Sequence, residues 1–566
     1  MRSFQRLHYL AAAAVLALLS AGCDKPPAAP PGSTQVSTGG IATPPIEQPT
    51  AQQPTVAPQA VAQQATFPPP PRDDAEGVAG ASETWDAFSM RAGEQLVRVG
   101  YSRTTSMKTA GPGGQEVVRT CNFTRTVMER AGQSVQQDLK VVSLDTPEGR
   151  LVAFETQMGE VMTTGAVRGG QLAISTTSSG RTEKRSIPWQ AEWGGLFAAE
   201  HSVRKKPLVP GEQRTVRGLV PMMNVAGDTE LKAIDYEMVH LPGGPRKLLK
   251  VLAVMQIGGQ QIESTQWADE KGETIKAIIP AVGQETLRTT KEDALRRSAG
   301  GKLDLLVNST VPLPGGFPNA QQTRKAVYLA KVKSGKIDGV FANCPSQQVM
   351  IKDERTAEVT VLKVVGTGAL AKRVGVPSVE NGASTQNDGT RSVPTTVPTA
   401  DDLAASSYIQ SDDPLVMQMA NSVAATESDP WKLACALEKH VDDTIKLKNF
   451  AQAFSTAAEV ARSLEGDCTE HAVLLAALCR ARKLPARCAF GLIYFEPLKG
   501  FAFHMWTEVW IGGQWVPMDA TLGQGGIAAD HLKLGDTSLS GQSPLAALLG
   551  VMNAFGRLEL QLVSAE

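Results

Sequence analysis

The stretch "EGDCTEHAVLLAALCRARKLPARCAF", residues 465–490, places Cys468 one residue after an acidic side chain and at the start of a long apolar run. Asp467 is a favoured helix N-cap residue, and the sequence from there to about Lys483 is nearly all apolar after its first turn. This pattern predicts a helix that is buried on most of its sides. The following segment, "ARCAFGLIYF", predicts a strand. Cys468 should therefore lie where a buried helix meets a sheet.

Two more strands are predicted in "FAFHMWTEVWI" and "QWVPMDAT", the runs on either side of Gly512-Gly513. A two-residue hairpin turn needs positive φ angles, which Gly adopts freely. In the register of such a turn, Trp506 lies opposite Asp519. His504 is two positions from Trp506, so it shares a face with Asp519 at roughly 7–8 Å between backbones, within side-chain reach. The hairpin therefore predicts an imidazole beside a carboxylate.

These residues together match the needs of thiol catalysis, which are a nucleophile, a base that takes its proton and a third group that orients the base. Cys468 would begin a helix, where backbone N–H groups and the positive end of the dipole favour a thiolate. A neighbouring imidazolium would favour the thiolate further. The order along the chain is Cys468, His504 and Asp519.

The motifs "GDCTEHAVLLAALCRA", "LPARCAFGLIYF", "HMWTEVWIGGQWVPMDATLG" and "DHLKL" resemble the bacterial transglutaminase-like superfamily. The resemblance covers about residues 405–566 and implies a papain-like core, in which a Cys helix packs on an antiparallel sheet that carries His and Asp. It implies that Cys468 is the nucleophile, His504 the general acid and base, and Asp519 the orienting residue. Family logic also suggests an oxyanion hole made by the backbone N–H of Cys468 and an upstream side chain, for which Gln452 is the candidate.

Other interpretations of Cys468 are a small buried structural thiol or a metal ligand. Most free cysteines behave as buried hydrophobes, but the register of the predicted hairpin favours catalysis here. Cys468 and His471 have C-x2-H spacing, with Cys479 and Cys488 nearby. Zinc sites usually need a second close pair, and Cys479 lies on the buried part of the same helix, so we expect no metal and no cofactor. The seven cysteines are too sparse for a disulfide scaffold.

The first 22 residues predict an export signal, with two early arginines before an apolar run too short to span a bilayer. Its end resembles a bacterial lipobox, which predicts lipid attachment at Cys23. The alternative is ordinary cleavage to a soluble secreted product. Residues 23–78 are rich in Pro, Ala, Gln and Thr and predict a disordered tether. We therefore expect an exported, membrane-anchored lipoprotein that faces the periplasm or the cell exterior.

The rest of the chain predicts a multidomain α+β protein. Short runs rich in Val, Thr and Ile predict an antiparallel β domain over 79–300 and a smaller β domain over 301–370. A polar linker is expected over 371–402 and the catalytic domain over 403–566.

The net charge of −1, from 56 basic and 57 acidic residues, gives no electrostatic case for a nucleic-acid partner. We therefore expect a protein or peptide substrate, a membrane contact through Cys23 and, for the β domains, a cell-envelope partner. The leading hypothesis is a cysteine peptidase or amidase that works through a thioester. The alternatives are cross-linking of Gln to amines, as a protein-glutamine gamma-glutamyltransferase does, or a non-catalytic envelope-binding protein with an inert transglutaminase-like module.

Overall fold

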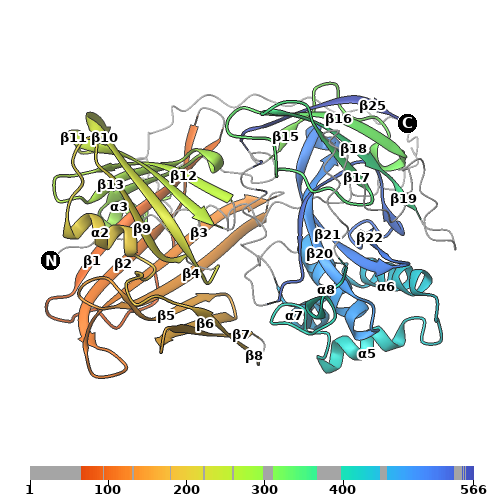
Figure 1. Ribbon diagram of the computed structural model, residues 1–566, viewed down its shortest axis with the longest axis horizontal. Coiled ribbons are helices and arrows are strands. Elements are labelled where there is room, and N and C mark those ends of the chain that lie inside the picture. Colours follow the sequence, from red (N-terminus) through yellow and green to blue (C-terminus); the bar gives the residue numbers. More distant parts are fainter. Residues whose placement is uncertain are drawn as a thin grey trace, which may run out of the picture.

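The computed structural model describes most of the chain from Thr66 onward (Figure 1). The described residues are 66–92, 95–130, 133–178, 180–220, 223–257, 260–297, 310–365, 397–446, 455–540, 551, 554 and 556–566. Figure 1 shows the N-terminal strands gathered on one side and the helices α5–α8 with the later strands on the other. The site discussed below lies on the side with the helices.

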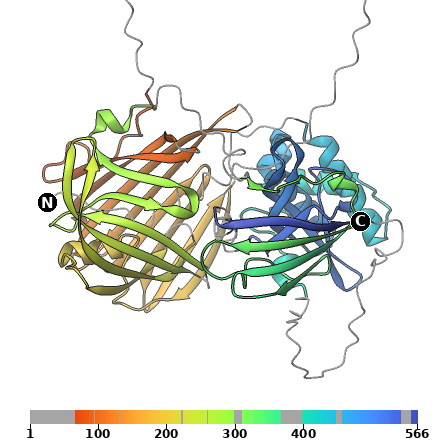
Figure 2. The same ribbon diagram turned by 90° about the horizontal axis from the view of Figure 1, so that it is seen from above.

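The N-terminal region forms one 14-stranded antiparallel sheet in the order β8-β7-β6-β5-β4-β3-β2-β1-β14-β13-β12-β11-β10-β9. Two meanders therefore make the sheet, and the pairing of β1 with β14 joins them. Figure 2 shows that the sheet curls strongly. Its strands are β1 (Ser82–Ala92), β2 (Gln95–Ala110), β3 (Glu116–Arg130), β4 (Gln133–Asp145), β5 (Leu151–Met158), β6 (Val161–Arg168), β7 (Gln171–Ser178), β8 (Arg181–Pro188), β9 (Gln213–Val220), β10 (Val225–Leu241), β11 (Gly244–Ile257), β12 (Gln260–Ala268), β13 (Thr274–Ile279) and β14 (Gln284–Thr289). The predicted large antiparallel region is confirmed.

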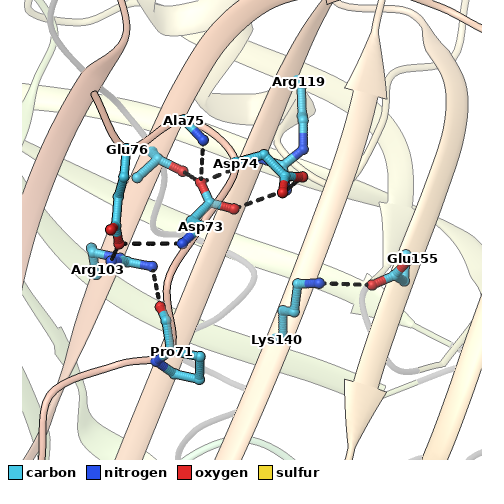
Figure 3. Close-up of polar contacts among 10 residues, drawn as sticks. Pro71, Asp73, Asp74, Ala75, Glu76, Arg103, Arg119, Lys140 and Glu155 are labelled. Carbon is cyan, nitrogen blue, oxygen red and sulfur yellow. Dashed lines mark hydrogen bonds and ion pairs between the residues drawn. The ribbon is translucent and has the colours of Figure 1, made fainter. Parts of the chain in front are cut away.

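The segment before β1 packs against this sheet. Phe67 is buried against the ring of Tyr101, with the centroids 6.0 Å apart. The carboxylate of Asp73 accepts hydrogen bonds from Thr105 and from Arg119, whose Nη2 lies 2.9 Å from Oδ1 (Figure 3). Burial alone would raise the pKa of Asp73, but the bonds to Arg119 and Thr105 lower it to about 2. Arg103 adds hydrogen bonds to Glu76 and to the Pro71 carbonyl (Figure 3). The segment is thus held to the sheet by aromatic packing, ion pairs and hydrogen bonds.

This packing corrects part of the predicted tether over 23–78. Its last residues, 66–78, are described and several are buried, whereas residues 23–65 lie outside the described residues. Composition does not predict this order, because the partners of the segment are side chains of the sheet, among them Tyr101, Arg103 and Arg119. Cys23 and the predicted signal segment, 1–22, also lie outside the described residues.

The second region contains three smaller antiparallel sheets. One has the order β15-β21-β20-β24 with β22 paired to β21, the second is β17-β18-β16-β25, and the third is β19-β23. The strands are β15 (Val311–Pro312), β16 (Lys325–Val332), β17 (Gln347–Ile351), β18 (Thr356–Leu362), β19 (Val364–Val365), β20 (Ala486–Phe495), β21 (Gly500–Ile511), β22 (Gln514–Met518), β23 (Gly526–Ile527), β24 (His531–Thr537) and β25 (Leu558–Ala565). Strands from 311–365 therefore share every one of these sheets with strands after 485. The predicted domain boundaries remain predictions.

Helices lie on one side of the sheet that contains β20 and β21. They are α5 (Pro414–Ser422), α6 (Pro430–Thr444), α7 (Ala457–Ser463) and α8 (Cys468–Ala481), while the short helices α2 (Ala198–Lys205) and α3 (Lys291–Ala294) belong to the N-terminal region. Helix α8 contacts both β20 and β21. The helix predicted from Asp467 is α8, and all but its last residue is buried. None of the described helices is long and apolar enough to cross a membrane.

The predicted hairpin register is confirmed. Thr507 pairs with Met518 and Glu508 with Pro517, so the next pair in the series would be Trp506 and Asp519. Gly512 and Gly513 have φ angles of 59° and 83°, the positive values that a tight hairpin turn requires.

Candidate active site

The first turn of α8 fixes the position of Cys468. The Asp467 carboxylate accepts a hydrogen bond from the Thr469 N–H at 2.8 Å, and the Glu470 carboxylate accepts one from the Asp467 N–H at 3.0 Å. This capping box satisfies backbone donors that would otherwise be unpaired at a buried helix end. Cys468 is fully buried, and its sulfur lies at the positive end of the helix dipole. Such a position favours a thiolate over a thiol.

Helix α8 packs on the strand that carries His504. The hydroxyl of Thr507 on β21 donates a hydrogen bond to the Ala472 carbonyl in the second turn of α8, at 2.9 Å. Both Thr507 and His504 are fully buried. The nucleophile and the base predicted from the sequence thus come from two elements in direct contact.

His504 and Asp519 form the central contact of the site. The ring Nε2 of His504 lies 2.8 Å from Asp519 Oδ2, and the Thr521 N–H donates to Asp519 Oδ1 at 2.9 Å. Burial alone would raise the pKa of Asp519, but the two imidazoles of His504 and His531 hold it well below its usual range. Asp519 is therefore an ionised carboxylate that accepts a hydrogen bond from the Nε2–H of His504. The other ring nitrogen of His504, Nδ1, then carries no proton and can accept a hydrogen bond. Among the described residues, that buried Nδ1 has no hydrogen-bond partner.

A second imidazole, which the sequence analysis did not single out, contacts the same carboxylate. His531 Nε2 lies 3.3 Å from Asp519 Oδ2, and its Nδ1 lies 2.7 Å from Asp530 Oδ1. All three side chains are buried. The motif "DHLKL" contains this Asp-His pair, but nothing in its local pattern indicates that it faces Asp519 across the turn that follows β22.

Two further buried groups surround the imidazoles. The Trp506 ring stacks on His504 with centroids 6.2 Å apart and meets His531 edge-on at 5.4 Å. Glu438 on α6 accepts a hydrogen bond from the Gly526 N–H at 3.3 Å. Burial raises the pKa of Glu438 to about 8, and the charge of Asp519 adds to the effect. An aromatic ring thus packs against both imidazoles, and a third buried acidic group lies near Asp519.

The spacing of the two imidazoles and Asp519 raises the question of a metal. One ligand-type atom from each of His504, Asp519 and His531 lies within 4.8 Å of the others. Each Nε2, however, lies at hydrogen-bond distance from an oxygen of an ionised carboxylate and therefore carries a proton. Because both Nε2 atoms face Asp519 Oδ2 at hydrogen-bond distance, we interpret this group as a set of hydrogen bonds.

The remaining sequence predictions concern cysteines and the oxyanion hole. Gln452 lies outside the described residues. Cys121, Cys344, Cys435, Cys468, Cys479 and Cys488 are free of disulfide bonds within the described part of the chain. Burial raises the pKa of Cys479 on α8 and raises that of Cys488 to about 12, so these neighbouring thiols stay protonated. His471 donates its Nδ1–H to the Asp467 carbonyl at 2.6 Å, which makes it part of the helix start.

Residues 417–520 match the model of the transglutaminase-like superfamily. The matched segment contains α8, β20, β21 and β22, and with them Cys468, His504 and Asp519. No curated protein matches the chain.

Several solved structures match parts of the chain at low scores. A β-barrel-like protein of a domain of unknown function from Brucella abortus matches with a TM-score of 0.29 and 9% identity, over 37% of this chain and 94% of that one. A protein from Cytophaga hutchinsonii, provisionally named a cysteine protease, has a TM-score of 0.26 and 16% identity, over 42% and 85%. A provisionally named protease from Parabacteroides distasonis has a TM-score of 0.16 and 10% identity, over 65% and 64%. At these scores the likenesses carry no functional argument.

Proposed function

From the premise that the C-terminal region carries a transglutaminase-like domain, the fold of a family of cysteine-dependent enzymes, we propose that the protein is an exported cysteine peptidase or amidase. One observation carries the proposal. His504 lies on the strand against which the Cys468 helix packs. Its Nε2 lies 2.8 Å from Asp519 Oδ2, and its buried Nδ1 has no hydrogen-bond partner among the described residues. An imidazole held in this tautomer is the arrangement that a thiol nucleophile requires.

The proposed reaction has two steps. In the first, Cys468 Sγ attacks the carbonyl carbon of an amide while its proton passes to His504 Nδ1. The tetrahedral intermediate collapses, the C–N bond breaks, and His504 returns the proton to the leaving amine, which leaves a thioester on Cys468. In the second, water attacks the thioester carbonyl carbon while His504 Nδ1 takes a proton from the water. The C–S bond then breaks, His504 returns the proton to Cys468 Sγ, and the carboxylic acid product leaves.

The other groups stabilise charge. Asp519 stays ionised and stabilises the imidazolium that His504 forms in each step. The oxyanion of each tetrahedral intermediate would accept a hydrogen bond from the Cys468 backbone N–H at the start of α8, and from Gln452 as the second proposed donor.

The test compares wild type with Cys468→Ala and Cys479→Ala. Iodoacetamide at neutral pH should label Cys468 in preference to the five other described cysteines, as read by peptide mass spectrometry. Cys468→Ala should abolish hydrolysis of a peptide library. Cys479→Ala, which alters a buried thiol of the same helix, should retain it. A Cys468→Ala protein with full activity would refute the proposal.

Water and an amine are competing acceptors for the same thioester. Incubation of a Gln-containing peptide with a fluorescent amine separates them, since hydrolysis releases ammonia without incorporating the amine. We propose that water is the acceptor. Stoichiometric incorporation of the amine would reassign the protein as a cross-linking enzyme.

The proposal includes a location. Lipid attachment at Cys23 would anchor the enzyme to a membrane and leave its substrate to be met outside the cytoplasm, and the large N-terminal sheet would contact a partner of the cell envelope. Metabolic labelling with a palmitate analogue tests the anchor, because Cys23→Ala should abolish the label.

A further inference from the structure

His531 occupies a position that the proposed reaction does not use. It begins β24, which pairs with β20 on the side away from β21, and it is 1% exposed. Its Nδ1 lies 2.7 Å from Asp530 Oδ1 and its Nε2 lies 3.3 Å from Asp519 Oδ2. Asp519 Oδ2 lies 2.8 Å from His504 Nε2 as well. Four buried side chains thus form one line, Asp530, His531, Asp519 and His504.

The geometry determines the protonation of His531. An ionised carboxylate can only accept hydrogen bonds, and both ring nitrogens of His531 face one, so both must donate. Burial alone would lower the pKa of His531, but the charges of Asp530 and Asp519 and the bonds to them raise it to about 9. The ring is therefore an imidazolium at neutral pH.

The positive charge of His531 offsets the cost of burying two carboxylates. Asp530 and Asp519 are both fully buried, and two unpaired carboxylates in such a place would each favour protonation. The other titratable groups that face this line are Glu438 on α6, whose own pKa is raised, and the Tyr328 hydroxyl of β16, which donates to the Ala529 carbonyl at 2.8 Å. The described residues of the line bring no Lys or Arg to it, so His531 is its cation.

We infer that His531 is a positioning residue, which holds the Asp519 carboxylate by an Nε2–H donor so that Oδ2 stays directed at His504. The inference rests on the proposed function, because the orientation of Asp519 matters only if His504 acts as a base. A carboxylate on Asp519, the residue directly after β22, has rotational freedom of its own. Bonds from Thr521 N to one oxygen and from His531 to the other remove it. His531 is in turn held by Asp530.

The first experiment compares His531→Gln with His531→Leu in the full chain. Gln places an amide N–H near the former Nε2 position and keeps the donor without the charge, whereas Leu removes both. We expect His531→Leu to lower kcat about 10- to 100-fold, the range for a lost outer hydrogen bond to a catalytic group, with KM little changed. His531→Gln should restore most of kcat. Wild-type kcat in His531→Leu, or equal losses in both variants, would overturn the inference.

A structural effect on β24 is controlled with Lys533→Gln. Lys533 lies two residues away on the same strand, is buried, and bonds Glu508 at 2.7 Å, remote from the imidazoles in the hydrogen-bond pattern. Its substitution should lower the melting temperature and leave kcat per folded molecule unchanged. If His531→Leu fails to fold, Asp530→Asn provides the test, since it keeps the side-chain shape. It should lower kcat severalfold, and an unchanged kcat would contradict the inference.

A spectroscopic measurement separates this inference from the proposed function. Two-dimensional NMR of the protein labelled with ¹⁵N-histidine should show one buried ring with both nitrogens protonated at pH 7, lost in His531→Gln. In Asp530→Asn the same ring should become neutral at a lower pH. If the wild type shows no thiol-dependent turnover while this signature is present, the proposed function fails and the protonation of His531 stands. A neutral ring at pH 7 would refute the inference whatever the activity.

Discussion

Glu438 shows at the scale of one residue how burial couples the site to pH. It is 1% exposed, it accepts a hydrogen bond from the Gly526 N–H, and its pKa is raised to about 8. Glu470 in the α8 capping box has a pKa raised to about 8 as well, through burial and the neighbouring charge of Asp467. In the unfolded chain both groups titrate at about 4.3. Between these values the folded protein binds more protons than the unfolded chain does.

The sign of the pH effect follows. A raised folded-state pKa stabilises the protein fully below about pH 4, and this stabilisation is lost as pH rises toward 8. We therefore expect the melting temperature to fall between pH 5 and pH 8. Glu438→Gln, which keeps the shape and the hydrogen-bond acceptor, should flatten this slope, with roughly 1–3 kcal/mol recovered at pH 8. Thermal unfolding measured across this range checks the effect, and identical slopes for wild type and variant would contradict it.

The start of α8 is the element that positions Cys468, the proposed nucleophile. Asp467 accepts from the Thr469 N–H and hydroxyl, so Asp467→Ala removes the cap and leaves backbone donors unpaired in a buried place. We expect a loss of about 1–2 kcal/mol in unfolding free energy and slower alkylation of Cys468, since its helix turn loosens. Asp467→Asn is the matched control because Asn is an equally good N-cap residue. Denaturant titration and the alkylation rate read the two effects, and equal stability of the two variants would exclude the capping role.

The elements that could be predicted from the sequence are those specified by residues close to one another along the chain. The Gly512-Gly513 turn sets the register of its hairpin because only the turn geometry is needed, and α8 follows from a cap residue and an apolar run. The contact of His504 with Asp519 follows from that register. The composition of residues 66–78 wrongly predicts a disordered tether. Their order depends on contacts with Arg119 and Thr105, which lie on strands further along the sequence.

Long-range partners could not be predicted. The pairing of β1 with β14 joins residues about 200 positions apart, and nothing in either strand specifies the other. The same holds for His531, whose role depends on a turn that brings it within 3.3 Å of Asp519. The residue types were visible in the sequence, but their distance from one another was set by tertiary packing.

At the scale of the whole molecule, the transglutaminase-like segment is not a complete folding unit. β15 pairs with β21 beside the site, β16 pairs with the last strand, β25, and β19 pairs with β23. The Tyr328 hydroxyl of β16 donates to the Ala529 carbonyl, next to the Asp530–His531 pair. Residues 311–365 therefore support the sheet that carries the proposed catalytic residue His504.

This arrangement predicts different behaviour for two fragments. A fragment of residues 397–566 should fold poorly, because it leaves β25 unpaired and exposes the apolar side chains of Leu558 and Leu560, which are 5% and 4% exposed in the full chain. A fragment of residues 310–566 retains all three sheets and should unfold in one cooperative transition. Differential scanning calorimetry and hydrolytic activity distinguish them. Within the longer fragment, Leu560→Ala should cost about 2–4 kcal/mol, whereas Val563→Ala, at a side chain that is 57% exposed, should cost less than about 0.5 kcal/mol. Cooperative unfolding of the shorter fragment with undiminished activity would show that residues 310–365 are dispensable and that the catalytic sheet is stabilised by the helices alone.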